Sequence, residues 1–150
     1  MGATYRHAVK EDIDILAPIM READRREVYA SHGASPKEAL EISFRNSVEC
    51  FTILSNDGQV IGMFGVAEDS PKTAVPWLLG ADDIPFIAKD LLVQSEKKVK
   101  EWKNKYSEMY NFVHCDNRAS LRWLEWLGFS FETEIKNNFV RFKWEARGVV

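Results

Sequence analysis

A tight turn in the first half of the chain constrains the fold more than any other feature of the sequence. Residues 51–55 (FTILS) and 59–66 (QVIGMFGV) are apolar runs of strand-like composition, and Asn56-Asp57-Gly58 lies between them. An Asp-Gly pair supplies the positive φ angles that a tight hairpin turn requires. The two runs are therefore predicted to pair antiparallel, and the fold has to contain a sheet built around that pair.

Helical patterns precede this hairpin. After a short strand over residues 4–9, the apolar residues of 10–30 recur at helical spacing, and acids stand in the first turn, where they suit the helix dipole. Pro18 lies inside this segment and is expected to kink it or split it. A second helix is predicted over 36–48, because its opening SPKE combines a serine cap, a proline at the first helical position and a capping-box glutamate.

Strand and helix patterns alternate after the hairpin. A loop is expected over residues 68–72, and Pro76 suggests an irregular or partly unpaired strand. The apolar run 109–115 is typical of a strand buried on both faces. The predicted elements are helices over 85–106 and 117–127 and strands over 73–79, 109–115, 130–135 and 139–144, the last two joined near Asn137-Asn138. The order β-α-α-β-β-β-α-β-α-β-β indicates a mixed α/β (α+β) fold.

The composition is that of an ordinary globular protein and excludes several function classes. The chain has 150 residues, 45% of them hydrophobic and 29% charged, which fits a single domain over residues 1–150. A net charge of −3 gives no general attraction to nucleic acid or to anionic membranes. No stretch resembles a signal peptide or a membrane helix, so we expect a cytoplasmic protein. Cys50 and Cys115 have no metal-ligand spacing, so we expect two reduced thiols and no metal.

The last helix carries a motif that a known family shares. The stretch DNRASLRWLEWLGF starts a helix at Asn117 and ends it at Gly128-Phe129. Together with the apolar strand before it and the order of the elements, this stretch resembles the GNAT (N-acetyltransferase) superfamily over nearly the whole chain. The resemblance implies a central, mostly antiparallel, twisted sheet with helices on both faces. It also implies that strands 73–79 and 109–115 are parallel neighbours that splay apart.

The resemblance further implies a place for acetyl-CoA beside the splayed strands. The residues that it assigns to the cofactor are Trp77, Leu78, Leu79, Gly80, Ala81 and Asn117. The loop that follows the first of these strands, LLGADDIPF, departs from the family's Arg/Gln-x-x-Gly-x-Gly/Ala pattern, because it has one glycine and no basic residue. Asp82 and Asp83 would cap the amides of the next helix and repel a diphosphate, and Pro85 removes one amide donor. These departures argue against tight binding of acetyl-CoA.

The family's proton donor is absent as well. Many GNAT enzymes place a tyrosine seven residues after the asparagine as general acid for the departing thiolate, and the resemblance puts Leu124 there. Leucine neither donates nor accepts a proton. His114 and Cys115 end a strand beside the expected thioester and remain as candidate base and nucleophile. Neighbours on a strand point to opposite faces, so the two cannot readily act as a pair, and structural packing is the alternative for each.

Other side chains admit both a functional and a structural interpretation. The charges of 21–27 either shape a substrate loop or only solvate a helix, and the lysines of 97–105 either meet phosphate or form a solvated face, which we favour. The acids of 68–69 either face an acceptor amine or are exposed loop residues. Trp123 and Trp126 lie on one side of the last helix, where they form a partner surface if both are exposed and core if they are not.

A narrower resemblance leads to a second candidate function. The WLL of 77–79, the long basic helix and the pattern Asn-x-x-Ser-x-Arg-Trp-Leu-x-x-Leu-Gly-Phe resemble small GNAT-like proteins associated with internal-virion assembly in short-tailed phages. The first candidate is an acetyl-CoA-dependent N-acyltransferase of weak or lost activity, acting on a small amine, a protein N-terminus or a lysine. The alternative is a non-enzymatic phage morphogenesis protein that binds a phage or host protein in the host cytoplasm.

Overall fold

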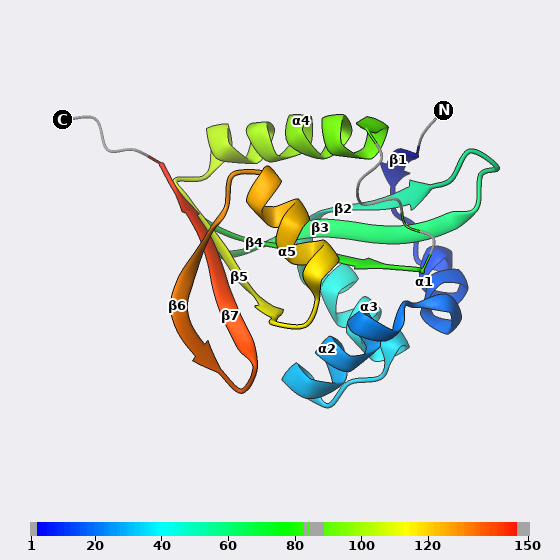
Figure 1. Cartoon of the computed structure of the whole chain (residues 1–150). Helices are drawn as coiled ribbons and strands as arrows, with labels where there is room; N and C mark the ends of the chain where they lie inside the picture. The colour runs from blue at the N-terminus through cyan, green and yellow to red at the C-terminus, as the bar shows by residue number, and fades with distance from the viewer. Residues whose placement is uncertain (1–2, 83, 85–88, 147–150) are drawn as a thin grey trace.

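The computed structural model describes residues 3–82, 84 and 89–146 (Figure 1). In this part of the chain, seven strands form one sheet in the order β1-β2-β3-β4-β5-β7-β6, with a single parallel pair, β4 and β5. The strands are β1 (Thr4–His7), β2 (Ser47–Leu54), β3 (Val60–Ser70), β4 (Thr73–Gly80), β5 (Glu108–His114), β6 (Ser130–Lys136) and β7 (Phe139–Glu145). The helices are α1 (Glu11–Leu16), the 3-10 helix η1 (Ala17–Ile19), α2 (Glu22–His32), α3 (Pro36–Asn46), α4 (Lys89–Lys105) and α5 (Arg118–Trp126). This mostly antiparallel sheet with helices on both faces confirms the predicted fold class.

The predicted hairpin consists of β2 and β3. Gly58 has a φ of 77°, as the tight turn requires. Both strands are longer than predicted, since β2 begins at Ser47, directly after α3, and β3 continues to Ser70. The predicted last turn of helix 36–48 and most of the predicted loop 68–72 are therefore wrong. The reason is that Ser47 has extended backbone angles (φ −80°, ψ 141°), so the hairpin pairing begins as soon as the helix ends.

Pro18 splits the first predicted helix, which was one of its two expected effects. α1 ends at Leu16, a 3-10 turn follows over Ala17–Ile19, and Met20 is extended (ψ 135°) before α2 begins. Proline has no N–H for the helical hydrogen-bond ladder, which explains the change of direction. Met20 then forms an isolated antiparallel bridge with Ala81, so the break brings the start of α2 to the end of β4.

Several local cap and turn signals are confirmed. A capping box opens α3. The side chain of Asn117 caps α5, and Gly128, with a φ of 97°, ends it. The turn between β6 and β7 uses positive φ angles at both Asn137 (54°) and Asn138 (68°). Each of these features depends on two or three neighbouring residues, which is why the sequence alone predicts them.

β4 and β5 run parallel and then separate. The described pairing joins Thr73 with Glu108 and Ala74 with Met109, after which the strands splay as the resemblance implied. β5 is not buried on both faces, contrary to the prediction, because Phe112 is 53% exposed. The splay explains this error, since a strand that leaves its neighbour opens space beside its own side chains.

The helices divide between the two faces of the sheet (Figure 1). Side chains of α4 and α5 pack with one set of sheet residues, and side chains of α1, η1, α2 and α3 pack with another. The helix predicted over 85–106 is described only from Lys89, so its predicted start lies outside the described residues. Its lysines do not form a wholly solvated face, because Lys98 is 9% exposed and pairs with Glu49 and Glu101.

Candidate functional site

The splay of β4 and β5 leaves a gap in the sheet, which we call the slot. At one end of the slot, the side-chain amide of Asn111 donates to the carbonyl of Pro76 at 2.8 Å. At the other end, residues of α2 bond both the N–H and the C=O of Gly80. Strand residues direct their backbone groups alternately to the two edges, so the N–H and C=O of Leu78 face the slot between these points. Across the slot, the described residues offer these two groups no hydrogen-bond partner.

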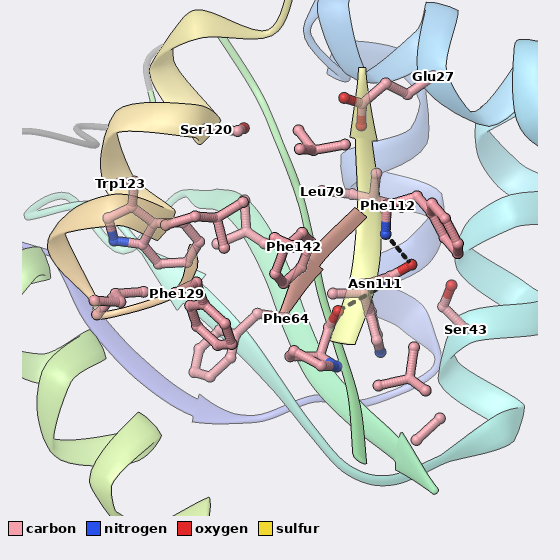
Figure 2. Close-up of a pocket in the computed structure, with 18 of the residues that line it drawn as sticks. Glu27, Ser43, Phe64, Leu79, Asn111, Phe112, Ser120, Trp123, Phe129 and Phe142 are labelled. Carbon is pink, nitrogen blue, oxygen red and sulfur yellow. Dashed lines mark hydrogen bonds between the residues drawn. The ribbon is translucent and has the colours of Figure 1, made fainter. Parts of the chain in front are cut away.

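A cavity of about 620 Å³ passes through the slot and extends to both faces of the sheet. This volume lies within the usual range for small-molecule sites. We call the part beside α5 the α5 lobe, and its walls include Phe64, Leu78, Leu91, Val99, Trp123, Leu124, Leu127, Phe129 and Phe142. We call the part beside α3 the α3 lobe, and its walls include Glu27, Val28, Ile42, Ser43, Asn46, Trp77, Leu79 and Phe112. Figure 2 shows the aromatic side chains of the α5 lobe on one side of β5 and Ser43 on the other.

Glu27 is the acidic side chain among the described residues that line the cavity. Its Oε1 accepts the backbone N–H of His114 at 2.8 Å and the side-chain amide of Asn117 at 2.9 Å. These two bonds fix the carboxylate above the end of β5 (Figure 2). Its Oε2 accepts no hydrogen bond from the described residues, so this oxygen remains available to a ligand.

Charged residues at the start of α2 tie the ends of the two splayed strands together, and we call Arg21, Asp24 and Glu27 the α2 latch. Asp24 Oδ2 accepts the N–H of Gly80 at 2.8 Å, and the backbone N–H of Arg21 donates to the C=O of Gly80 at 2.8 Å. The guanidinium of Arg21 donates to Asp24 Oδ1 at 3.1 Å and to Asn117 Oδ1 at 3.1 Å. The latch thus joins the end of β4 to the cap of α5. It also shows that the charges of 21–27 do more than solvate a helix.

Asp24 is 1% exposed. Burial raises its pKa from 3.8 to about 6, although the charge of Arg21 and the N–H of Gly80 act in the opposite direction. The nearby carboxylate of Glu27 adds to the rise in pKa. Burial therefore favours the neutral form of Asp24 at the point where the latch holds β4.

The residues expected to hold a cofactor fall into two groups. Three of them line the cavity, namely Trp77, Leu78 and Leu79. The other three make contacts inside the protein: Gly80 is held by α2, the N–H of Ala81 donates to Ile61, and the buried side chain of Asn117 bonds to the latch. The slot therefore brings together the strand part of the expected site, whereas Gly80 and Asn117 serve the latch and Ala81 bonds to β3.

The aspartates expected to cap the helix after β4 are only partly described. Asp82 is an exposed turn residue, and Asp83 and Pro85 lie outside the described residues. An aspartate does accept a backbone N–H at the end of β4, that of Gly80, but this aspartate is Asp24, which comes from α2. The contact between Asp24 and Gly80 could not be predicted from the sequence, because the two residues are 56 positions apart in the chain.

His114 and Cys115 are not among the described residues that line the cavity. The ring of His114 packs edge-on against Phe139, with centroids 5.3 Å apart. Cys115 is half-buried against the core between the sheet and the helices α4 and α5. At the other thiol, Cys50, burial raises the pKa to about 12, so the thiolate does not form near neutral pH.

Leu124 occupies the position of the expected acid, is 8% exposed and lines the α5 lobe. Two tyrosines of neighbouring elements are engaged away from the cavity: Tyr106 donates to Glu68, and Tyr110 donates to Asp69 at 3.1 Å. Burial raises the pKa of Tyr106, as does the charge of Glu68. These bonds also give the acids of 68–69 a structural role.

The two tryptophans of α5 have different surroundings. Trp123 lines the α5 lobe, whereas Trp126 is 47% exposed. They therefore form neither a joint surface nor a joint core.

Residues 3–82, 84 and 89–146 contain neither a metal-binding cluster nor a membrane-spanning helix. No three His, Cys, Asp or Glu side chains gather there in a way that would hold a metal ion. No helix in this part combines the length and the apolar character needed to cross a membrane.

Comparison with known proteins identifies the fold. No protein-family model and no curated protein matches the chain. Among solved structures, an acetyltransferase (GNAT family) from Bacillus anthracis matches with a TM-score of 0.70 at 10% identity, covering 97% of this chain and 95% of the other. A spermidine N-acetyltransferase from Vibrio cholerae, in complex with CoA and spermine, matches with a TM-score of 0.68 at 14% identity and 95% coverage of both chains.

A third match is the aminoglycoside acetyltransferase AAC(6′)-Ib in complex with coenzyme A, with a TM-score of 0.64 and 16% identity, covering 95% of this chain and 94% of the other. The chain therefore has the GNAT fold that the sequence motif predicted. At identities this low, the likeness concerns the fold.

Proposed function

We propose that the protein transfers an acyl group from a coenzyme A thioester to an amine. The observation that carries this proposal is the cavity through the slot, which places the open backbone edge at Leu78 between an apolar lobe and a lobe with a carboxylate. Two reactants can then approach the same point from opposite faces of the sheet. Such positioning supplies much of the acceleration in acyl transfer to amines. The CoA bound in two proteins of the same fold supports the choice of donor.

The chain provides a role for each side of the slot. The N–H of Leu78 would donate to the carbonyl oxygen of the donor, which gains negative charge when the amine attacks. Glu27 would hold an amine in the α3 lobe and accept on Oε2 the proton that the nitrogen loses when it attacks. The thioester supplies an activated carbonyl carbon and a thiolate leaving group. Because Leu124 carries no proton, water would protonate the thiolate, and we propose that turnover is slow for this reason.

The residues at the slot fit only part of a coenzyme A molecule. The backbone groups of Leu78 are open to a thioester arm, but the neighbouring amide on the same edge, that of Gly80, is already bonded to Asp24. A ligand that needs this amide has to displace a buried carboxylate. We therefore propose that acetyl-CoA binds weakly.

A substitution at Leu78 tests donor binding. Leu78→Pro removes the N–H that faces the slot, and Pro76, two residues earlier on the same edge, indicates that β4 accommodates a proline at such a position. Acetyl-CoA should raise the melting temperature of the natural chain and of Leu78→Val, but not that of Leu78→Pro. Equal shifts in all three would show that the slot does not bind the donor.

A substitution at Glu27 tests the chemistry. Glu27→Gln keeps an oxygen for the N–H of His114 but removes the base. In an assay of thiol release over a panel of amines, kcat/KM should fall about hundredfold, with the acetyl-CoA thermal shift unchanged. A variant that retains full activity would exclude Glu27 as the base.

The latch favours a second candidate function. Under this alternative, Asp24 permanently accepts the N–H of Gly80, and Leu124 stands where the family's acid would be. The fold would then serve for binding only, as in the phage morphogenesis role that the narrower resemblance implied. The partner would be a phage or host protein. Under this alternative, a folded chain would show no thermal shift with any CoA ester at millimolar concentration. A clear shift with acetyl-CoA would count against it.

A further inference from the structure

The α5 lobe is an apolar space inside the protein. Its walls include Phe64, Leu91, Leu124, Phe129 and Phe142, and all of these except the half-buried Phe64 are buried. Protein interiors are packed closely, and voids larger than a water molecule are few. The whole cavity of about 620 Å³ has the volume of roughly twenty water molecules. This volume covers both lobes and is partly open to solvent, so the apolar core side chains of the α5 lobe line one part of a space that can admit a ligand.

Three polar side chains of α4 at the edge of the α5 lobe are already matched by other protein groups. Gln94 donates to the carbonyl of Ala3 at 2.8 Å, and Ser95 donates to the carbonyl of Leu91 at 2.6 Å. Lys98 pairs with Glu49 at 3.2 Å. A polar ligand in this lobe would lose hydrogen bonds to water and would gain none from these three side chains. The chemistry of the walls therefore selects an apolar occupant.

The position of Leu124 strengthens this conclusion. The residue lies where the resemblance implied a hydroxyl group, and it instead brings methyl groups into the lobe beside Trp123. The substitution that removes a proton donor thus also completes an apolar wall. The lobe is continuous with the slot at Leu78, so an apolar chain inside it would end at the open backbone edge.

We infer that the donor carries an acyl chain longer than acetyl, with its hydrocarbon in the α5 lobe and its thioester carbonyl at Leu78. This inference rests on the proposed function and names the class of its donor. The amine nitrogen forms a bond to the carbonyl carbon, and the carbon–sulfur bond breaks. The neutral amine gives one proton to Glu27, which passes it to solvent, and solvent water gives a proton to the thiolate, so the products are an amide and free CoA thiol.

The test compares ligands that differ only in the acyl chain. Calorimetric titration of the natural chain with octanoyl-CoA should give a dissociation constant at least about tenfold lower than with acetyl-CoA, because each buried methylene adds to affinity. Free octanoate serves as the third ligand. Equal affinity for the two CoA esters would overturn the chain-length inference and leave the proposed function intact. Binding of octanoate as tight as that of octanoyl-CoA would overturn the inference in favour of a fatty-acid site, and binding of no CoA ester would overturn both.

A pair of variants on α5 locates the chain. Ser120→Phe puts a ring into the cavity, whereas Glu125→Phe puts the same ring on the exposed side of the helix. Circular dichroism melts establish that both are folded. Ser120→Phe should remove the preference for octanoyl-CoA over acetyl-CoA, and Glu125→Phe should keep it. A preference that survives Ser120→Phe in a folded variant would place the chain elsewhere and overturn the inference.

Discussion

The carboxyl group of Asp24 couples the stability of the protein to pH. Its pKa is about 6 in the folded chain against an ordinary value of 3.8, so the folded state resists ionisation that the unfolded state accepts. The stability contributed by this difference is present below pH 3.8 and is lost as the pH rises through about 6. At 1.36 kcal/mol per pKa unit, we predict a loss of roughly 3 kcal/mol in the free energy of unfolding.

Urea unfolding at several pH values between 4 and 7 measures this loss. Asp24→Asn retains an oxygen for the N–H of Gly80 but cannot titrate, so it is the matched control. The natural chain should lose stability relative to Asp24→Asn as the pH rises over this interval. Curves that remain parallel would show that Asp24 does not titrate there.

At Leu124, a pair of variants that differ by one hydroxyl group tests whether an acid at this position speeds the proposed reaction. We predict that Leu124→Tyr raises the rate of acetyl transfer about tenfold over Leu124→Phe, because the two variants differ only in a hydroxyl that can protonate the thiolate. Thiol release from acetyl-CoA in the presence of an accepted amine measures both rates. Equal rates in the two variants would mean that departure of the thiolate does not limit turnover.

At the scale of elements, the pairing of β2 and β3 depends on a glycine. A Cβ at Gly65 would lie 2.5 Å from the backbone carbonyl oxygen of Glu49, which cannot move without shifting β2. A Cβ at Gly62 would instead meet the ends of Ile84 and Ile53, which can rotate away. We predict that Gly65→Ala lowers the free energy of unfolding by about 2–3 kcal/mol and Gly62→Ala by less. Chemical denaturation of the two variants decides the order.

The attachment of α1 to the sheet depends on Asp12. Its carboxylate accepts bonds from Arg6 at 2.8 Å, from the N–H of Val9 at 2.9 Å and from the hydroxyl of Thr52 at 2.6 Å. Burial by itself opposes ionisation of Asp12, but these three donors together hold its pKa below the ordinary value.

We predict that Asp12→Asn lowers the free energy of unfolding by about 2 kcal/mol at pH 7. Because the pKa of Asp12 is lowered on folding, the difference between the variant and the natural chain should shrink as the pH falls below 3.8. Thermal melts of both proteins at pH 7 and pH 3 measure this difference. A difference that is the same at both values would assign the effect to packing.

The elements that the sequence predicted correctly are those whose signals are local. A hairpin turn, a helix cap and a proline break each involve a few adjacent residues, and all of them are where they were expected. The ends of β2 and β3 were misplaced because strand length depends on the partner strand. Pairing that begins at Ser47 in β2 and continues to Ser70 in β3 leaves no mark in the sequence of either segment alone.

The candidate site was predictable only in outline. The motif positions indicated residues that line the cavity, Trp77, Leu78, Leu79 and Leu124, and their roles toward a cofactor stay predictions. The latch and Glu27 did not, because they join residues about 90 positions apart, such as Glu27 and Asn117. The available signal was the spacing of Arg21, Asp24 and Glu27, which places three charges on one face of a helix.

At the scale of the whole molecule, the sheet consists of two parts that meet weakly. β1 to β4 and β5 to β7 share two paired positions in the described residues, and the latch closes the other end of the slot. We predict that Asp24→Ala, which removes the acceptor for the N–H of Gly80, increases hydrogen exchange at the start of α5 and at the end of β4, while β2 and β3 remain protected. Exchange monitored by mass spectrometry at pH 7 separates these segments. Uniform acceleration over the whole chain would indicate global destabilisation instead.

An opening that runs from one face of the sheet to the other also has a kinetic consequence for the proposed reaction. Two substrates with separate entrances need not wait for each other to leave, so a ternary complex forms and no acylated side chain is required as an intermediate. For the proposed reaction, plots of reciprocal initial rate at several fixed amine concentrations should give intersecting lines. Parallel lines, the mark of a ping-pong cycle, would mean that the two sides of this passage are never filled together.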